Sequence, residues 1–321
     1  MRARNRGPFI ACGAVLLTLG IAGSPPPAEA AAQIYGGFPE IDASARSVAL
    51  GGNLAALAAG AEALGSNPAG LLDTDAREVT FGYADLFGLG LISHSSAQAA
   101  WPLLGKSVQW DGGEIRTVRR PPPANRALGV AVSNLSTDIE PDRYDETQLT
   151  VAFASRGFLG FRWGADYRLL WAQSNLEDVG ANGHAMDFGV KRQWRSLTVG
   201  FAARNLASSV NWQRGLDEPL AKRFQLAAAF RPLRPLTLQA TTEWVGDAGS
   251  RRASSLGVEC APVAALTLRG AIRQREDAVD SSTEWSAGAG FQAWKLRIAY
   301  GISHHAQELG DTQRWSGSFQ F

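Results

Sequence analysis

The stretch Phe161-Arg162-Trp163-Gly164-Ala165-Asp166-Tyr167-Arg168-Leu169-Leu170-Trp171 decides the fold. Apolar side chains fall at every second position from Phe161 to Trp171, so they share one face of a β-strand. The other face is mostly charged and includes Arg162 and Arg168. The two end aromatics are ten residues apart. That is the length of one tilted strand crossing a bilayer, roughly 9–11 residues, and aromatics at both ends of an apolar band are typical of the membrane interfaces.

The same alternation recurs from about residue 78 to the end of the chain. Further strands are expected near 78–85, 94–103, 126–135, 147–156, 184–194, 196–205, 223–231, 236–244, 253–261, 266–273, 283–293, 296–303 and 312–321. Together they make about fourteen strands, an even number as in bacterial barrels. The pattern predicts an all-β fold, a transmembrane antiparallel β-barrel. A soluble β-sandwich also alternates and stays an open alternative at this point.

One segment interrupts this regularity. Residues 105–125, which contain Pro121-Pro122-Pro123, form the longest irregular stretch between strands, and we expect a surface loop there.

Composition excludes several classes of protein. The 321 residues carry 31 Lys plus Arg and 30 Asp plus Glu, a net charge of +1, which argues against nucleic acid as a partner. Only two cysteines occur, so a disulfide scaffold is excluded. Four histidines lack metal-ligand spacing, and no nucleophile elbow or phosphate loop is present. We therefore expect no enzyme activity, no catalytic residues, no metal and no cofactor.

The first thirty residues are typical of a secretory signal. Arg2, Arg4 and Arg6 precede an apolar run from Phe9 to Ala22, and Ala28-Glu29-Ala30 resembles a cleavage site. We expect residues 1–30 to be removed, with an uncleaved anchor as the alternative. No later stretch approaches the roughly 20 apolar residues of a membrane helix. A mature chain that enters a membrane would therefore do so as a closed barrel.

The segment before the strands has a different pattern. Over residues 42–72 the apolar positions suggest a helical face, with Asp42 or Ser44 as the N-cap. This face contains Val48, Leu54, Leu57, Ala58, Ala61 and Leu64. We predict a helical hatch over 31–76 inside the lumen of a barrel formed by 77–321. An amphipathic helix outside the barrel is the alternative.

A short motif follows this helical pattern. Asn67 suits the cap of a short helix, Pro68 its first turn and Gly70 its exit, with Ala69 between them.

Several motifs resemble one family. Residues 44–52, the motif 67–71, residues 199–206 and residues 309–316 are similar to PorV/PorQ-type outer-membrane proteins, which belong with the FadL-like fatty-acid transporters. The resemblance implies a fourteen-stranded barrel with an N-terminal hatch in the bacterial outer membrane. It also implies that Asn67, Pro68 and Ala69 lie in a hatch that gates a hydrophobic ligand.

The last strand carries outward apolar side chains and ends on an aromatic residue. Trp315, Phe319 and Phe321 share one face, which resembles the signal that the outer-membrane barrel assembly machinery recognises. We expect this machinery and the outer-membrane bilayer to be partners.

The polar faces of the strands predict a charged lumen. The candidate lumen-lining residues are Arg162, Asp166, Arg168, Arg204, Arg223, Arg231, Glu243, Glu259, Arg269, Arg273 and Arg297. Their mixed signs favour internal ion pairs, with an anion-attracting lining as the alternative.

These patterns and the resemblance lead to two candidate functions, with an inert structural barrel as a third alternative. The first is hatch-gated passage or binding of hydrophobic small molecules, for which we expect an apolar pocket between hatch and wall. The second is an accessory of a type IX-like secretion system that docks exported protein cargo at the rim through residues 105–125.

Overall fold

The computed structural model describes residues 37–41, 44–74, 76–103, 108–111, 114–117, 124–139, 141–175, 179–213, 215, 217–246, 251–276, 281–305 and 310–321. The signal predicted at 1–30 and the capping role considered for Asp42 lie outside these residues. No helix among the described residues is long and apolar enough to cross a membrane.

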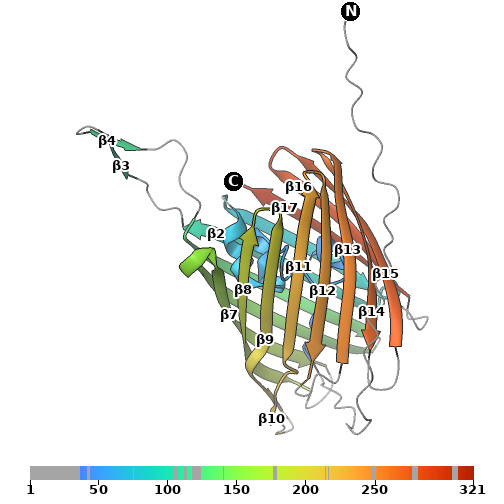
Figure 1. Cartoon of the computed structure of the whole chain (residues 1–321). Helices are drawn as coiled ribbons and strands as arrows, with labels where there is room; N and C mark the ends of the chain where they lie inside the picture. Colours follow the sequence, from blue (N-terminus) through green and yellow to red (C-terminus); the bar gives the residue numbers. More distant parts are fainter. Residues whose placement is uncertain are drawn as a thin grey trace, which may run out of the picture.

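Within the described residues, fourteen antiparallel strands close into a barrel, which confirms the predicted fold class (Figure 1). The strands are β1 Glu78–Leu86, β2 Ile92–Leu103, β5 Arg126–Ile139, β6 Asp142–Arg156, β7 Arg162–Ser174, β8 Ala181–Trp194, β9 Leu197–Trp212, β11 Arg223–Leu233, β12 Leu236–Val245, β13 Arg251–Val263, β14 Leu266–Glu276, β15 Ser281–Ala293, β16 Leu296–His304 and β17 Asp311–Gln320. Each strand pairs with its neighbours along the chain, and β17 closes the ring on β1.

Three shorter strands complete the sheets. β10, Asp217–Glu218, pairs with the end of β9. β3, Val108–Asp111, and β4, Glu114–Thr117, form a hairpin of their own within the segment that was predicted to be a loop (Figure 1). The Gly-Gly pair between them is a strong hairpin signal, so the segment is not irregular throughout.

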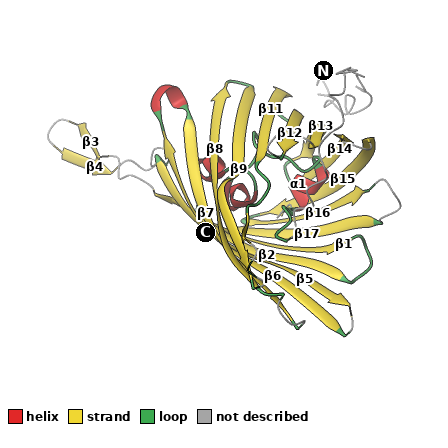
Figure 2. Cartoon of the chain, turned by 90° about the horizontal axis from the view of Figure 1, so that it is seen from below, coloured by secondary structure: helices red, strands yellow, loops and turns green. Residues whose placement is uncertain are grey.

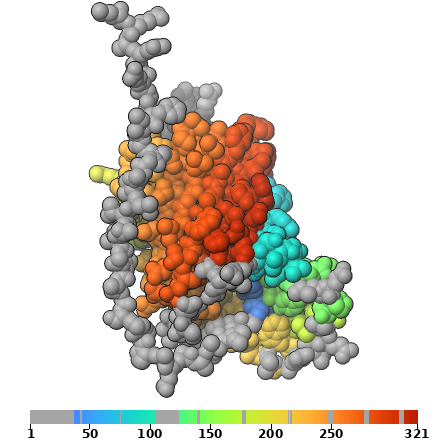
Figure 3. All heavy atoms as spheres, turned by 90° about the vertical axis from the view of Figure 1, so that its right-hand side faces the viewer, coloured from blue at the N-terminus to red at the C-terminus, as the bar shows by residue number. Residues whose placement is uncertain are grey.

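The wall has an apolar outer face and a polar inner face. In β7, Tyr167 is 39% exposed and its neighbour Arg168 only 2%. Exposed large hydrophobic residues recur on the other strands, and the strands from β13 to β17 form a continuous outer surface in Figure 3. This alternation is the one predicted from residues 161–171, and it fits a barrel that faces lipid outside.

The described part of residues 37–74, here called the inner segment, lies inside the ring of strands (Figure 2). It contains one α-helix, α1 Ala45–Ala49, and two 3₁₀ helices, η1 Gly60–Gly65 and η2 Pro68–Asp73. The helical pattern expected over 42–72 is thus realised only as three short helices. Gly51, Gly52 and Gly60 adopt positive φ, which breaks a right-handed helix and lets the chain fold back within the narrow lumen.

Two of the predicted caps are confirmed. Ser44 caps α1, because its side chain accepts a hydrogen bond from the backbone N–H of Ser47. Asn67 caps η2 by accepting from the N–H of Ala69, and Pro68 occupies the first turn as predicted. Gly70 was expected to end this helix, but η2 continues to Asp73.

Glycines in the wall allow the inner segment to pack backbone against backbone. A Cβ at Gly164 of β7 would lie 2.6 Å from the carbonyl carbon of Pro68 and 2.7 Å from the nitrogen of Ala69. A Cβ at Gly200 of β9 would overlap the carbonyl of Ala55. These glycines are needed for space, not for an unusual φ.

The fit at β7 makes a stability prediction. Gly164→Val should lower the stability of the folded barrel by about 1–3 kcal/mol, because the added atoms have no room against η2. Thermal unfolding in detergent, followed by the loss of β-sheet circular dichroism, measures this change. Gly317→Val is the matched control, since nothing lies within 4 Å of a Cβ there. Equal melting temperatures of the two variants would contradict the proposed close fit.

Candidate functional site

Asn67 ties the inner segment to two strands of the wall. Its side chain is fully buried and its Nδ2 donates to the carbonyl of Ala55 at 2.8 Å. The same nitrogen lies 3.2 Å from the carbonyl oxygens of Val190 in β8 and Phe201 in β9. Its Oδ1 meanwhile accepts from Ala69. The side-chain amide of Asn67 therefore forms hydrogen bonds with the first free N–H of η2 and the carbonyl of Ala55, and it also contacts the wall.

The rest of the motif packs on the same side of the lumen. Pro68, Ala69 and Gly70 are buried, and the first two lie against Gly164. A Cβ at Gly70 would overlap the carbonyl of Ala58, so this glycine serves close packing inside the inner segment. The motif 67–70 is thus packed closely against both the wall and the rest of the inner segment.

Ion pairs hold both ends of the helical region. Asp73, at the end of η2, pairs with Arg162 and, at 2.5 Å, with the buried amine of Lys191. Arg46 in α1 pairs with Glu259 of β13 at 2.8 Å. Buried charges of this kind are costly to leave unpaired, so each pair resists movement of the inner segment.

A separate network holds residues 37–41. The Glu40 carboxylate lies 3.0 Å from Nη1 of Arg168 in β7 and 2.6 Å from Nη1 of Arg204 in β9. Both guanidinium groups also pair with Asp187 of β8, each at 3.0 Å. Burial alone would raise the pKa of Glu40, but the charges of Arg168 and Arg204 lower it from 4.5 to about 2.

Phe38 anchors the same residues by packing. Its ring is buried in an apolar cluster with Leu170, Val210 and Leu220. Its backbone N–H donates to the Glu146 carboxylate at 2.8 Å. Sequence reasoning missed Phe38, Glu40 and Asp187, because no local pattern marks them.

A pocket of about 340 Å³ lies between residues 37–41 and strands β9 and β11 to β14. Six arginines and two glutamates are among its lining residues, which makes it strongly basic. These charged residues are Arg204, Arg223, Arg251, Arg252, Arg273, Arg275, Glu40 and Glu243. Phe38, Ile41, Leu220 and Val245 add apolar surface.

The charge of this pocket corrects an expectation. An apolar pocket was predicted between hatch and wall, but arginines at the lumen positions of β11 and β14 dominate this one. Glu243 pairs with Arg223 at 3.0 Å and with Arg273 at 3.3 Å, so one carboxylate serves two cations. The buried Nε of Arg223 reaches no acceptor among the described residues. The lining therefore keeps cationic donors to spare.

Most of the other lumen candidates are also found inside. Asp166 is buried, and Arg269 pairs with Glu259 at 2.8 Å. Arg231 and Arg297 share the inward-facing register but are exposed at the rim. Ion pairing was the favoured interpretation of this set, and the pairs above support it, while the arginine pocket matches the anion-attracting alternative.

The wall beside the pocket is irregular. The β8–β9 register shifts between Met186 and Phe188, and Asn205 of β9 adopts a positive φ. Beyond Arg204, β9 no longer pairs with β11. Side chains close the wall there instead: Asn205 donates to the carbonyl of Ala221, and Ser208 accepts from the N–H of Leu220 at 3.0 Å.

The barrel is similar to solved hydrocarbon channels. CymD, a monoaromatic hydrocarbon channel, matches with a TM-score of 0.63 at 12% identity over 89% of this chain and 99% of that one. The toluene transporter TbuX of Ralstonia pickettii matches with a TM-score of 0.59 at 12% identity, over 86% and 97%. A FadL homologue of Pseudomonas aeruginosa matches with a TM-score of 0.55 at 11% identity, over 83% and 95%.

The chain shares the fold of these FadL-like channels. No protein-family model matches the sequence, and a search of the curated proteins finds no match. The PorV/PorQ resemblance is therefore not confirmed.

The contacts of Asn67 predict a measurable anchor. Asn67→Ala removes the cap of η2 and leaves the Ala55 carbonyl without its donor, so it should cost about 2 kcal/mol. The melting temperature in detergent and the rate of proteolysis of the inner segment report this loss. Asn211→Ala is the control, because that amide is exposed. A change no larger than that of the control would show that Asn67 is not an anchor.

The pKa of Glu40 sets a pH window. Because the folded value, about 2, lies below the ordinary 4.5, its ion pairs contribute fully above pH 4.5 and are lost as pH falls toward 2. Hydrogen-exchange protection of residues 37–41 should therefore persist at pH 5 and fall between pH 4.5 and 2. Glu40→Gln should remove this pH dependence. A variant that keeps the same profile would assign it to other groups.

Proposed function

We propose that this chain is an outer-membrane barrel that passes small hydrophobic molecules carrying an acidic group. The observation that carries the proposal is the arginine pocket beside residues 37–41. The hydrocarbon channels that share the fold support a hydrophobic body for the molecule. The excess of arginine supports an acidic group, because a lining of one sign concentrates counter-ions.

The lining suits a molecule with two different parts. Phe38, Leu220 and Val245 offer apolar contacts to a ring or short chain. Arg251, at the start of β13, shares the inward register of Ala253 and offers an exposed guanidinium group to a carboxylate. A pocket of about 340 Å³ has room for a molecule of one aromatic ring.

Residues 37–41 are the gate in this proposal. They separate the arginine pocket from a second pocket of about 40 Å³, and Glu40 lines both. An acidic ligand competes with Glu40 for Arg204, so binding favours the state in which Glu40 is released. This differential affinity is what a ligand-driven shift requires. The motif at 67–70 serves as the fixed base of the hatch.

The exit lies at the irregular part of β9. The anchored helices of the inner segment obstruct the lumen below the pocket, whereas Asn205 and Leu220 border the pocket where the strand ladder is interrupted. Side-chain hydrogen bonds close this part of the wall, and they open at a lower cost than a ladder.

The remaining assignments belong to the same proposal. The signal segment directs export, and the bilayer receives the apolar outer face. Trp315, Phe319 and Phe321, which lie exposed on or just after β17, present the assembly signal to the barrel assembly machinery. The comparisons give no support to the secretion-accessory hypothesis. In that hypothesis the cargo binds to the loop 105–125. Residues 103 and 126, on either side of this loop, lie at the end of the barrel where Phe321 lies.

Benzoate and benzamide test the proposal, because they have the same shape and differ in charge. Uptake of the radiolabelled compounds into proteoliposomes, corrected for protein-free liposomes, should favour benzoate over benzamide. Arg251→Gln should lower benzoate uptake several-fold and leave benzamide unchanged. Glu40→Gln should raise uptake of both, because the gate loses its ion pairs.

The controls separate the parts of the proposal. Arg143→Gln removes an exposed cation at the same end of the barrel that does not line the pocket, and it should change neither rate. Acetate, an anion without a hydrophobic body, should enter no faster than through protein-free liposomes. Equal uptake of benzoate and benzamide through the wild-type barrel would overturn the acidic-group assignment.

A further inference from the structure

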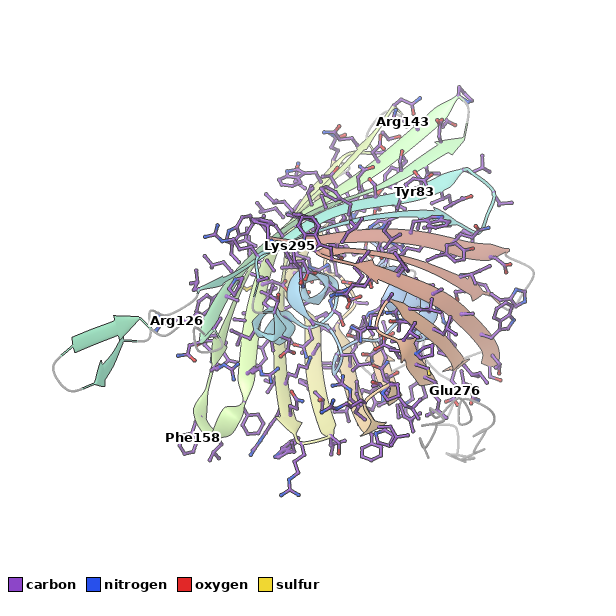
Figure 4. All side chains as sticks on the ribbon, turned by 90° about the horizontal axis from the view of Figure 1, so that it is seen from above. Tyr83, Arg126, Arg143, Phe158, Glu276 and Lys295 are labelled. Carbon is purple, nitrogen blue, oxygen red and sulfur yellow. The ribbon has the colours of Figure 1, made fainter. Side chains whose placement is uncertain are left out.

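The two ends of the barrel differ in charge. One end of the barrel carries the two-residue turns at 195–196, 234–235, 264–265 and 294–295. Six of the exposed cations at this end are here called the basic rim, and Arg77 is a further one beside the chain terminus. The six are Arg126, Arg195, Arg231, Arg234, Lys295 and Arg297. Arg126 begins β5, Arg195, Arg234 and Lys295 lie in the β8–β9, β11–β12 and β15–β16 turns, and Arg231 and Arg297 lie near the ends of β11 and β16. Figure 4 is drawn from this end and labels Arg126, Phe158 and Lys295.

The basic rim is not neutralised by its surroundings. Three carboxylates of the barrel and the inner segment near this end point inward and are engaged there: Asp73 pairs with Lys191, Glu78 accepts from Gln320 at 2.9 Å, and Glu259 pairs with Arg269. None of the six side chains of the basic rim forms an ion pair with a carboxylate in the part of the chain that the structure describes. Among the described side chains of the barrel strands and turns at this end, the exposed charges are therefore all positive, apart from the chain terminus.

The opposite end provides an internal comparison. Its exposed side chains include Asp138, Asp142, Asp217 and Glu276 beside Arg143. Arg143 is paired there with Asp145 at 2.8 Å. Acidic and basic groups are thus mixed at that end, and the uncompensated positive charge belongs to the two-residue turns.

The basic rim is continuous with the apolar band. Phe158 is 84% exposed and Trp294 82% exposed, both in turns at this end. The ammonium group of Lys295 lies 5.7 Å from the ring of Trp294, and the guanidinium of Arg192 lies 4.5 Å from the ring of Trp194. Amphipathic pairs of this kind occupy the level of the lipid headgroups.

We propose that the basic rim binds the phosphate groups of anionic phospholipids in the periplasm-facing leaflet. The two-residue turns mark the periplasmic end of a bacterial barrel, and cations at headgroup level attract anionic lipid. Exposed aromatic tips beside the cations favour a lipid over a soluble anion, because a soluble anion gains nothing from Phe158 or Trp294. The proposal is independent of the arginine pocket, which opens away from the turns.

Native mass spectrometry of the full-length protein in detergent tests the proposal. The probes are dioleoyl phosphatidylglycerol and dioleoyl phosphatidylcholine, which have the same chains and differ in headgroup charge. The wild-type barrel should retain phosphatidylglycerol over phosphatidylcholine by roughly fivefold or more, the effect expected of one cation near an anionic surface. Arg234→Gln with Lys295→Gln should reduce this preference by at least fivefold.

Matched variants keep the result interpretable. Arg143→Gln with Lys222→Gln also removes one Arg and one Lys, both exposed, but at the opposite end, and should keep the preference. Arg234→Lys with Lys295→Arg keeps the rim charge and should also keep it. Heat-dependent migration on a gel shows that each variant is folded.

Three results would overturn the proposal. They are equal retention of the two lipids by the wild type, an unchanged preference in the Arg234→Gln/Lys295→Gln variant, and loss of the preference when inorganic phosphate is added at millimolar concentration. The last would identify the rim as a site for soluble anions. None of these results depends on whether benzoate passes the barrel.

Discussion

The structure depends on close contact between the backbone of the inner segment and the inner face of the wall. A barrel of fourteen strands encloses a lumen that side chains alone do not fill, and here a folded segment occupies it. That segment comes close only because glycines such as Gly164 and Gly200 leave room for its backbone. The side-chain amide of Asn67 then contacts the carbonyl oxygens of Val190 and Phe201 in the wall. The wall glycines bring the inner segment close, and this closeness lets the side-chain amide of Asn67 reach the wall.

Charge is distributed around this contact so that each region of the inner segment is held differently. The helical region is tied down by both packing and ion pairs, through Gly164 and through Asp73. Residues 37–41 depend on Phe38 and on the ion pairs of Glu40. In the proposed mechanism an anion in the arginine pocket would act on the second region and leave the first in place, because Arg204 belongs to both the pocket and the Glu40 network. A gate and a fixed base can therefore exist in a single short segment.

The strands could be predicted because each one has an apolar outer face and a polar inner face. Residues 161–171 alternate so strongly that the face and approximate length of β7 follow from the sequence alone. The inner segment could not be predicted in this way, because its alanines are buried on all sides and carry no directional signal. Val48, Leu54 and Leu64 gave a helical period, yet Gly51 and Gly60 turn the chain between them. The cap at Asn67 was predictable because its hydrogen bond is local.

The site was less predictable than the fold because it is built across strands. Arg223, Glu243 and Arg273 come from β11, β12 and β14, and their pairing depends on register. Arg223 and Arg231 both have the inward-facing register of β11. Arg223 lines the pocket, whereas Arg231 lies at the rim.

The net charge of +1 gives no sign that the two ends of the barrel differ in charge. The carboxylates that would neutralise the turn end are held inside by the inner segment, as Asp73 and Glu259 show. Anchoring the inner segment therefore draws these carboxylates away from the basic rim, and the same ion pairs that hold the inner segment to the wall leave this end of the barrel positively charged.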